Sequence, residues 1–211
     1  MDLEFYVNSK NMKTKRFKEY EFIDIDRFEA NEMYWDFLES GIVNDFKKSI
    51  EKLKKIIKKD PDFFDPYISL YEYYLFDKEP KKALDILTKG YERAMDRILD
   101  RGRFPDKLSW LFMENRHIIR MIFNYANMMW TVENKKEALR LFNLLLRSNP
   151  NDNIGARYSI VALLEGYESQ EHFDEQFMDD HSYGLDAIAL ERWFEKYAKK
   201  HKKEIGWWLE M

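Results

Sequence analysis

Three arginines have the clearest chemical meaning in this sequence of 211 residues. Arg116 and Arg120 are four residues apart, so a helix would place them one turn apart on the same face. Phe123 and Asn127 follow in the same predicted helix, and Arg157 stands near the start of a later one. A guanidinium group binds a carboxylate through two parallel hydrogen bonds. We therefore expect these five residues to form a peptide-binding site for a carboxylate or an acidic peptide.

A structural role is the alternative interpretation of the same arginines. They could instead pair with Glu114, Asp152 or Glu165 and brace the helices to which they belong. The sequence leaves both interpretations open.

The rest of the sequence lacks a catalytic or metal-binding signature. Cysteine is absent, which excludes disulfides, cysteine zinc sites and thiol nucleophiles. The four histidines form no HExxH or other metal spacing, and there is no GxSxG motif or phosphate-binding glycine loop. Residues 179–181, Asp-Asp-His, are more typical of an exposed acidic loop than of a metal site. We expect no catalytic residue, no metal and no cofactor.

Apolar residues at helical spacing predict an all-α fold. For example, Phe46, Ile50, Leu53 and Ile57 form one apolar stripe. Glycine and proline are scarce, at seven and five residues, which argues against a many-turned β fold. The expected helices cover about residues 28–39, 46–59, 65–77, 80–100, 107–131, 134–148, 152–165 and 186–203, with a short helix within 168–180. Their expected N-caps are Asp65, Asp106, Asn134, Asp152 and Asp186.

A repeated spacing relates the helix pairs to one another. The tetratricopeptide (TPR) repeat of 34 residues has a small residue, a large residue four positions later and a proline twelve positions later. The small residue allows two helices to approach closely, and the proline ends the second helix of the pair. Three segments follow this spacing in whole or in part: Ser49, Leu53 and Pro61; Ala83 and Leu87; and Ala138, Phe142 and Pro150.

The interval between two of these segments is too long for a single repeat. Ala83 and Ala138 are 55 residues apart, which exceeds 34 residues by 21. The apolar period continues on both sides of the break at Gly102 and Pro105. We therefore expect two neighbouring helices lengthened by about three turns each, forming an elongated central hairpin.

Residues 84–165 also resemble a group of bacterial TPR proteins. In that group a W…E-x-R-P-Y-M-R helix precedes a REEA helix and an NPNDNQGxRY motif. The matching segments here are residues 110–120, 136–138 and 149–158, with departures at His117, Ile118 and Ile154. The resemblance implies a TPR-like α-solenoid, a short right-handed stack of antiparallel helix pairs, and no particular activity.

The TPR resemblance also implies which residues face the concave groove. The first helix of each pair lines that groove. In this chain the implied groove residues are Arg120, Phe123, Asn127, Trp130 and Thr131, with Arg116 one turn earlier and Arg157 from the next repeat. The set is similar only in part to the carboxylate clamp of chaperone-binding TPR domains. Phe123 stands at a clamp lysine position, and the preceding repeat offers Asp65 and Glu72.

The two ends of the chain differ from the repeats. We expect an N-terminal extension over residues 1–28, packed on the first helix, a repeat domain over 29–180, and a C-terminal capping helix with an apolar tail over 181–211. Trp207 and Trp208 in this tail suit a cap on the exposed end of the stack. The alternatives are that the tail docks into a second copy, giving a homodimer, or occupies its own groove until a ligand displaces it.

The composition bears on location and on partners. No signal peptide or run of about 20 apolar residues is present, so we expect a cytoplasmic protein without a membrane partner. The net charge of −4 gives no general attraction to nucleic acid. Nucleic-acid binding through the lysine-rich helix at 47–59 or the basic run Lys10, Lys13, Lys15, Arg16 and Lys18 is an alternative.

These observations favour a non-enzymatic TPR scaffold that binds a protein or peptide in its concave groove. A small-ligand sensor or an enzyme with a site where the hairpin meets the groove is the alternative from another class.

Overall fold

The computed structural model describes residues 18–40, 45–178 and 184–211 and is helical throughout, which confirms the all-α prediction. Within these ranges only isolated bridges and no sheet occur. No described helix has the length and apolar character that a bilayer span requires. The α-helices are α1 (Phe28–Glu39), α2 (Phe46–Lys59), α3 (Asp65–Phe76), α4 (Pro80–Ile98), α5 (Arg116–Thr131), α6 (Lys135–Ser148), α7 (Ala156–Leu164), α8 (Gln170–Asp174), α9 (Ala187–Tyr197) and α10 (Lys202–Leu209).

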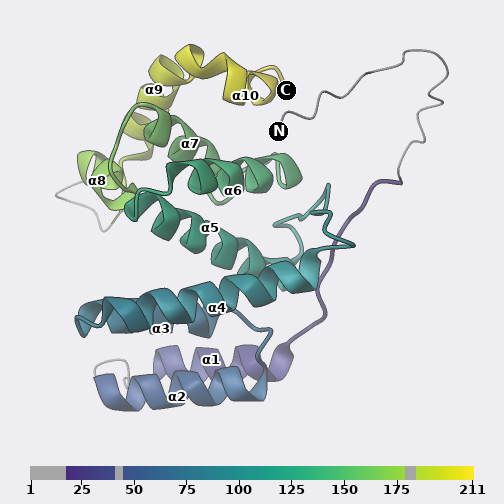
Figure 1. Cartoon of the computed structure of the whole chain (residues 1–211), viewed down its shortest axis with the longest axis vertical. Coiled ribbons are helices and arrows are strands. Elements are labelled where there is room, and N and C mark those ends of the chain that lie inside the picture. The colour runs from purple at the N-terminus through teal and green to yellow at the C-terminus, as the bar shows by residue number, and fades with distance from the viewer. Residues whose placement is uncertain (1–17, 41–44, 179–183) are drawn as a thin grey trace, which may run out of the picture.

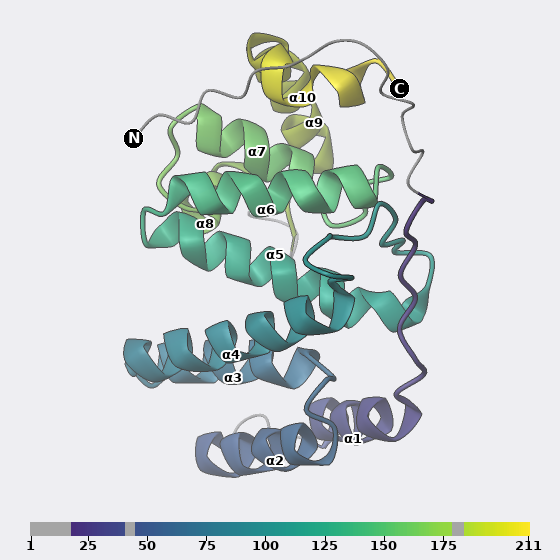
Figure 2. The same ribbon diagram turned by 45° about the vertical axis from the view of Figure 1, so that its right-hand side comes forward.

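The helices pack as sequential antiparallel pairs. α1 lies against α2, α3 against α4 and α5 against α6, and each pair stacks on the next. Figure 2 shows the same stack from a second side, running from α1 and α2 at one end to α9 and α10 at the other. α3 also contacts α5, and α8 and α9 both contact α7. α3 and α5, the first helices of two successive pairs, are thus neighbours across the stack.

Local sequence signals account for most helix ends. The side chain of Asn134 accepts a hydrogen bond from the backbone N–H of Glu137, and Asp186 accepts two at the start of α9, as predicted. Asp65 was expected to cap α3, and this expectation is wrong. Phe64 occupies the N-cap position of α3 and Asp65 the first helical turn, where its carboxylate is held by another helix.

Asp152 acts as a cap from outside its helix. α7 begins at Ala156, later than predicted, and the Asp152 carboxylate accepts hydrogen bonds from the N–H groups of Ala156 (2.7 Å) and Arg157 (3.0 Å). Gly155 has a φ of 79°, a left-handed conformation that glycine adopts without a steric cost. This tight turn brings the carboxylate back onto the first turn of α7.

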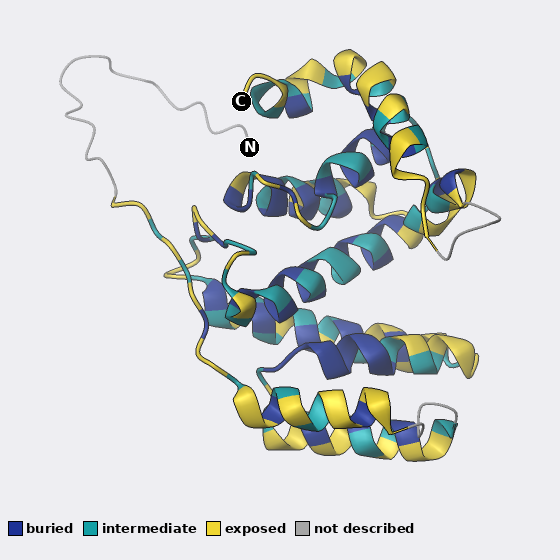
Figure 3. Ribbon diagram, turned by 180° about the vertical axis from the view of Figure 1, so that it is seen from behind, coloured by how far each residue is buried: buried dark blue, intermediate teal, exposed yellow. Residues whose placement is uncertain are grey.

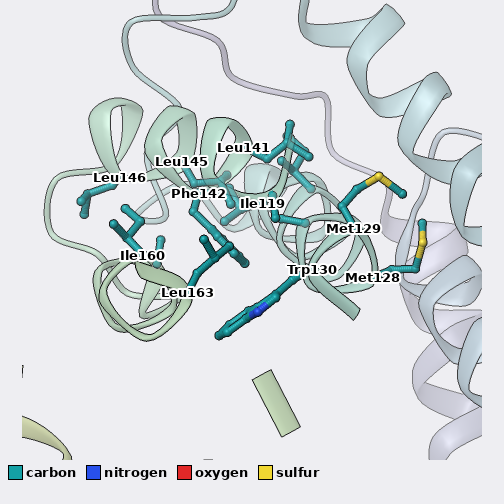
Figure 4. Close-up of a cluster of buried hydrophobic side chains, with 14 of the residues drawn as sticks. Ile119, Met128, Met129, Trp130, Leu141, Phe142, Leu145, Leu146, Ile160 and Leu163 are labelled. Atoms are coloured by element: carbon teal, nitrogen blue, oxygen red, sulfur yellow. The ribbon is translucent and has the colours of Figure 1, made fainter. Parts of the chain in front are cut away.

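The centre of the core lies between α5, α6 and α7. Figure 3 shows buried residues concentrated in these helices and in the first turns of α3, whereas α1 and α2 are largely exposed. In Figure 4 the side chains of Ile119, Phe142 and Ile160 belong to one cluster contributed by all three helices. The Trp130 indole closes one side of this cluster and donates a hydrogen bond to the carbonyl of Tyr167 (2.8 Å).

A glycine permits the closest contact between α3, α4 and α5. A Cβ atom added to Gly90 of α4 would lie 3.1 Å from the Cβ of Tyr67 in α3 and 2.6 Å from the Cε of Met121 in α5. Tyr67 and Met121 are both fully buried, so neither has free space to move into. The absence of a side chain at Gly90 therefore fixes how near these three helices pack.

The elongated central hairpin is not present. α4 is 19 residues long and ends at Ile98, and α5 begins only at Arg116 instead of at Lys107. Residues 99–115, which we call the connector, contain turns and one short 3₁₀ helix, Met113–Asn115. Most of the 21 additional residues of this interval therefore form an irregular segment packed beside the stack.

Backbone groups of the connector bond to distant segments, and this explains why it does not continue the helix. The N–H of Leu108 donates to the carbonyl of Ser148 (2.9 Å), and the N–H of Asp106 donates to the carbonyl of Tyr20 (2.8 Å). Leu108 is fully buried. This apolar residue of the periodic pattern therefore packs in the core although it does not belong to a helix. Gly102, at a φ of 82°, and Pro105 interrupt the chain before it.

The described part of the N-terminal extension, residues 18–27, packs on the connector and on α4 and α5, whereas packing on the first helix was expected (Figure 1). The N–H of Phe22 donates to the carbonyl of Lys107 (3.0 Å), and the Tyr20 hydroxyl donates to the carbonyl of Ile98 (2.8 Å). Of the predicted basic run, Lys18 alone is described, and the other four residues lie outside the described ranges.

The C-terminal tail is helical and packs on α6 and α7. Ile205 is fully buried, the Trp208 indole donates to the carbonyl of Pro150 (2.8 Å), and the Arg147 guanidinium lies 4.7 Å from the centre of the Trp207 ring. Ile188 of α9 is exposed. Phe173 and Phe177 are buried, and the short helix expected within residues 168–180 is divided into α8 and a 3₁₀ turn.

Candidate peptide-binding groove

One face of α5 carries four of the five predicted site residues. Arg116, Arg120, Phe123 and Asn127 are separated by four, three and four residues, which is the spacing of a single helix face. All four are partly exposed, whereas Ile118, Ile119, Met121 and Ile122 between them are buried. These four side chains share one partly exposed face, along which two cavities lie. Trp130, which was also expected to line the groove, is instead fully buried in the core.

The first cavity, here called the N-terminal cavity, lies at the start of α5. It has a volume of about 490 Å³ and is open on one side. α1, the segment before α1, the start of α3, the connector and α5 all contribute to its walls. The lining residues are Ile25, Asp26, Arg27, Phe28, Asn31, Trp35, Phe63, Asp65, Met113, Glu114, Arg116, His117 and Arg120.

Arg116 has hydrogen-bonding capacity left over in this cavity. Its guanidinium lies 5.3 Å from the centre of the Trp110 ring, and its Nε donates to the Trp110 carbonyl (3.0 Å). Among the described residues no carboxylate pairs with Arg116, and its terminal N–H groups hold no described partner. The connector thus fixes the orientation of Arg116 and leaves its outer edge available to another molecule.

Arg120 is already paired. Its Nε and Nη2 donate to the two carboxylate oxygens of Asp65, at 2.8 and 2.5 Å. The Asp65 side chain is only 10% exposed, so this pair links α5 to the first turn of α3. Arg120 therefore joins the first helices of two neighbouring pairs, which corresponds to the bracing role considered as the alternative, with Asp65 as its partner.

The second cavity, here called the C-terminal cavity, lies at the other end of the α5 face and has a volume of about 500 Å³. It is lined by Phe123, Asn127, Asp152, Asn153, Ile154, Gly155, Arg157, Tyr158, Gln170, Phe173, Asp174, Leu185 and Leu190. α5, the turn before α7, α7 itself and α8 supply most of these residues. The turn centred on Gly155 brings its backbone to the wall of this cavity.

Arg157 is neutralised inside the C-terminal cavity. Its guanidinium pairs with Asp152 (3.1 Å) and Glu191 (3.2 Å), and it also donates to the Tyr158 hydroxyl. The same guanidinium lies 5.1 Å from the centre of the Trp208 ring. Arg157 therefore holds together the start of α7, α9 and α10, and the Asp152 partner is one that the bracing interpretation named.

Two buried polar atoms of the C-terminal cavity lack hydrogen-bond partners among the described residues, the acceptor Asn127 Oδ1 and the donor Arg157 Nε. The Oδ1 atom of Asn127 is buried and accepts no hydrogen bond. One oxygen of Asp174 accepts from the Gln170 amide (2.7 Å), and no described cation pairs with this carboxylate. Burial raises the pKa of the Asp174 carboxyl, and the Gln170 hydrogen bond opposes the rise only in part.

The five predicted residues do not converge on one point. Arg116 and Arg120 line the N-terminal cavity, whereas Phe123, Asn127 and Arg157 line the C-terminal cavity. The expected cluster around Phe123 is wrong in this respect, because α5 is 16 residues long and its face spans both cavities. The predicted set is thus divided between two cavities along one face of α5.

Four exposed apolar residues of the N-terminal cavity were missed. Ile25, Phe28, Trp35 and Met113 are between 56% and 67% exposed and line the same cavity. Of the aromatic residues Trp35 and Phe37 in α1, only Phe37 is buried. For Phe28 and Trp35, the signal that could have found them is the surplus of large apolar residues in α1 beyond the single stripe that one core contact needs.

A cluster of buried charged residues around Asp24 was also missed. Two of its members, Arg27 and His117, line the N-terminal cavity. The Asp24 carboxylate is fully buried and accepts hydrogen bonds from Arg27 (2.7 Å), Arg97 (2.5 Å) and His117 (3.1 Å). The Nδ1 of His117 accepts from the N–H of Phe64 (3.2 Å), which makes the Nε2–H the donor to Asp24. The only sequence signal was an acid among apolar residues, three positions before Arg27.

The pKa of Asp24 reports how strongly this cluster holds the carboxylate. Burial alone would raise the pKa, but the hydrogen bonds from His117, Arg27 and Arg97 outweigh it and hold the pKa well below the ordinary value of an aspartate. Arg27 continues the cluster, because its Nη1 donates to both oxygens of Asp60 at 2.6 and 2.7 Å. The cluster therefore ties the segment before α1 to α4, α5 and the end of α2.

Neither a metal site nor a similarity to a known protein indicates what this site binds. Within the described ranges no group of three or more His, Asp or Glu side chains could hold a metal, and residues 179–181 lie outside those ranges. Comparison with protein-family models, with curated proteins and with solved structures finds no match for this chain.

Proposed function

We propose that this chain is a non-enzymatic, TPR-like scaffold that binds a peptide segment of a partner protein along the exposed face of α5. The sequential antiparallel pairs support this proposal. The residues at the repeat positions support it too, because they are buried where the pattern requires close helix contacts. They are Ser49, Leu53, Ala83, Leu87, Ala138 and Phe142, none more than 1% exposed.

The observation that carries the proposal is the composition of the N-terminal cavity. Four large apolar side chains around this one cavity are exposed to water: Ile25, Phe28, Trp35 and Met113. Scattered exposed apolar residues are common on protein surfaces, whereas an apolar patch of this kind usually marks an interaction site. Arg116 supplies, at the same place, a cation that pairs with no carboxylate of the described ranges. Apolar anchors beside one oriented charge are the usual composition of a peptide-binding surface.

The charges of the cavity define the peptide. A carboxylate of the peptide would take the free edge of Arg116 through a bidentate pair. Asp26 and Glu114 also line the cavity, and they disfavour a second acidic residue close to the first. The proposed ligand is therefore a peptide with large apolar side chains and a single acidic residue or a carboxyl terminus, instead of a strongly acidic tract.

A peptide selection tests this function directly. A library of random twelve-residue peptides displayed on phage is selected on the full-length chain, and enriched peptides are measured by fluorescence anisotropy on purified variants. We expect enriched peptides that share one acidic and at least one aromatic or aliphatic position and that lose binding in Trp35→Ala and Arg116→Ala. Arg192→Ala removes an exposed arginine of α9 that lines neither cavity and serves as the control. Enriched peptides that bind all variants equally would exclude the groove.

A further inference from the structure

Two acceptors of the C-terminal cavity have incomplete hydrogen bonding among the described residues. Asn127 Oδ1 and one oxygen of Asp174 accept no hydrogen bond from the described residues. Buried acceptors without partners are uncommon and are costly to maintain. Asn127 Oδ1 is such a buried acceptor, and the Nε of Arg157 is a buried donor without a partner in the same cavity, so a polar group from outside the chain would complete the site.

The charge of the cavity is negative once its pairs are counted. Arg157 is the only cation that lines it among the described residues, and both Asp152 and Glu191 pair with Arg157. Asp174 then stands without a compensating cation. A positively charged donor would satisfy its carboxylate, whereas an acidic group would be repelled.

The cavity walls fit an aliphatic stem better than a flat or strongly hydrated group. Phe123, Ile154, Phe173, Leu185 and Leu190 supply apolar surface between the polar atoms. A lysine side chain has this composition, with four methylene groups that pack on apolar surface and an ammonium that donates up to three hydrogen bonds. The volume of about 500 Å³ admits such a side chain together with part of its backbone.

We propose that the C-terminal cavity is a lysine-binding subsite, which receives the ammonium of a lysine of the bound peptide between Asp174 and Asn127. This inference rests on the proposed peptide-binding function and specifies its ligand further. The peptide then carries opposite charges toward its two ends: an acidic group at Arg116 and a lysine at Asp174.

The length of α5 sets the separation between these two charges. Arg116 and Asn127 are eleven residues apart, which corresponds to about 17 Å along the helix axis. An extended peptide covers this distance with about five residues. The acidic residue and the lysine of the ligand are therefore about five positions apart, and the order of the two charges fixes the direction in which the peptide lies.

A blocked amino acid tests the subsite without any knowledge of the natural partner. N-acetyl-lysine methylamide and its norleucine analogue, which lacks the ammonium, are titrated into the full-length ¹⁵N-labelled chain and followed by NMR. We expect saturable shifts for lysine at residues of the C-terminal cavity, binding at least about tenfold weaker in Asp174→Asn, and recovery in Asp174→Glu. Equal shifts with lysine and norleucine, or unchanged lysine binding in a folded Asp174→Asn, would overturn the proposal.

The peptide selection separates failure of this subsite from failure of the groove. If selected peptides need Trp35 and Arg116 but show no lysine about five positions from the acidic residue, the subsite is wrong and the peptide-binding function stands. If blocked lysine binds as expected but no peptide is enriched, the subsite stands and the peptide-binding function is wrong.

Discussion

Arg120 and Asp65 form a two-pronged ion pair that joins α5 to the first turn of α3, with nitrogen–oxygen distances of 2.8 and 2.5 Å. Arg116, one turn away on the same face, pairs with no described carboxylate. Two arginines that look equivalent in the sequence therefore have different roles. Arg120 links two neighbouring helix pairs, whereas Arg116 has no carboxylate partner among the described residues.

The Arg120–Asp65 pair should contribute to stability instead of to binding. Arg120→Ala leaves the Asp65 carboxylate, whose side chain is 10% exposed, without its donor, and we expect a loss of about 2 kcal/mol in the free energy of unfolding. Urea unfolding measures this loss. Asp65→Asn should cost a similar amount, and the double variant should cost less than the sum of the two. Strict additivity would show that the two residues act independently.

The Asp24 cluster should make stability depend on acid pH. The pKa of Asp24 is lower in the folded chain than in the unfolded chain, where it lies near 4. Its stabilising contribution is therefore complete above about pH 4 and is lost as the pH falls through the folded-state value. We expect Asp24→Asn to cost about 3 kcal/mol at pH 7, because the nearly buried Arg27 guanidinium loses its charged partner.

The difference between wild type and Asp24→Asn should become smaller below about pH 4. Urea unfolding between pH 7 and pH 3 follows it, with Asp85→Asn as the control because this carboxylate is exposed on α4. Asp85→Asn should change the free energy of unfolding by less than about 0.5 kcal/mol at pH 7. A difference for Asp24→Asn that stays constant down to pH 3 would contradict the assigned pairs.

Two helical glycines should respond in opposite ways to alanine. Gly90→Ala places a Cβ 3.1 Å from the Cβ of Tyr67, and we expect overpacking to exceed the gain in helix propensity by about 1 kcal/mol. Gly206→Ala in α10 meets only the Cβ of Lys202, at 3.5 Å, and should be neutral or stabilising. Thermal unfolding of both variants measures these two changes in stability. Equal effects would mean that Gly90 does not set the packing of α3, α4 and α5.

The apolar tail should stabilise the end of the stack. Deleting residues 205–211 removes the buried Ile205 and the contacts of Trp208 with Pro150 and Arg157. We expect the melting temperature to fall by roughly 10 °C and light scattering to show aggregation. If instead the full chain is a dimer and the shortened chain is a monomer of unchanged melting temperature, the tail is a dimer contact.

Helices could be predicted from sequence where local signals determine them. The apolar period located α1, α2 and α6, and the caps Asn134 and Asp186 are as expected, because each depends on residues within a few positions. The connector was mistaken for helix for the same reason. Its period continues, but its backbone N–H groups bond to Tyr20 and Ser148, which are distant in sequence and invisible to a periodic pattern.

The candidate site was predictable only as a helix face. The spacing from Arg116 to Asn127 correctly placed four side chains on one exposed side of α5. It could not show that Asp65 would pair with Arg120, because that contact joins residues 55 positions apart. The Asp24 cluster escaped for the same reason, since Arg97 and His117 reach it from other helices.

The affinity of the best selected peptide for the Arg116→Ala variant tests the central claim most directly. Fluorescence anisotropy compares this variant with wild type and with the control Arg192→Ala at the same ionic strength. We expect Arg116→Ala to weaken binding about tenfold or more without changing the melting temperature, and Arg192→Ala to stay within about twofold of wild type. Unchanged affinity in Arg116→Ala would contradict the assignment of the α5 face as the peptide-binding groove.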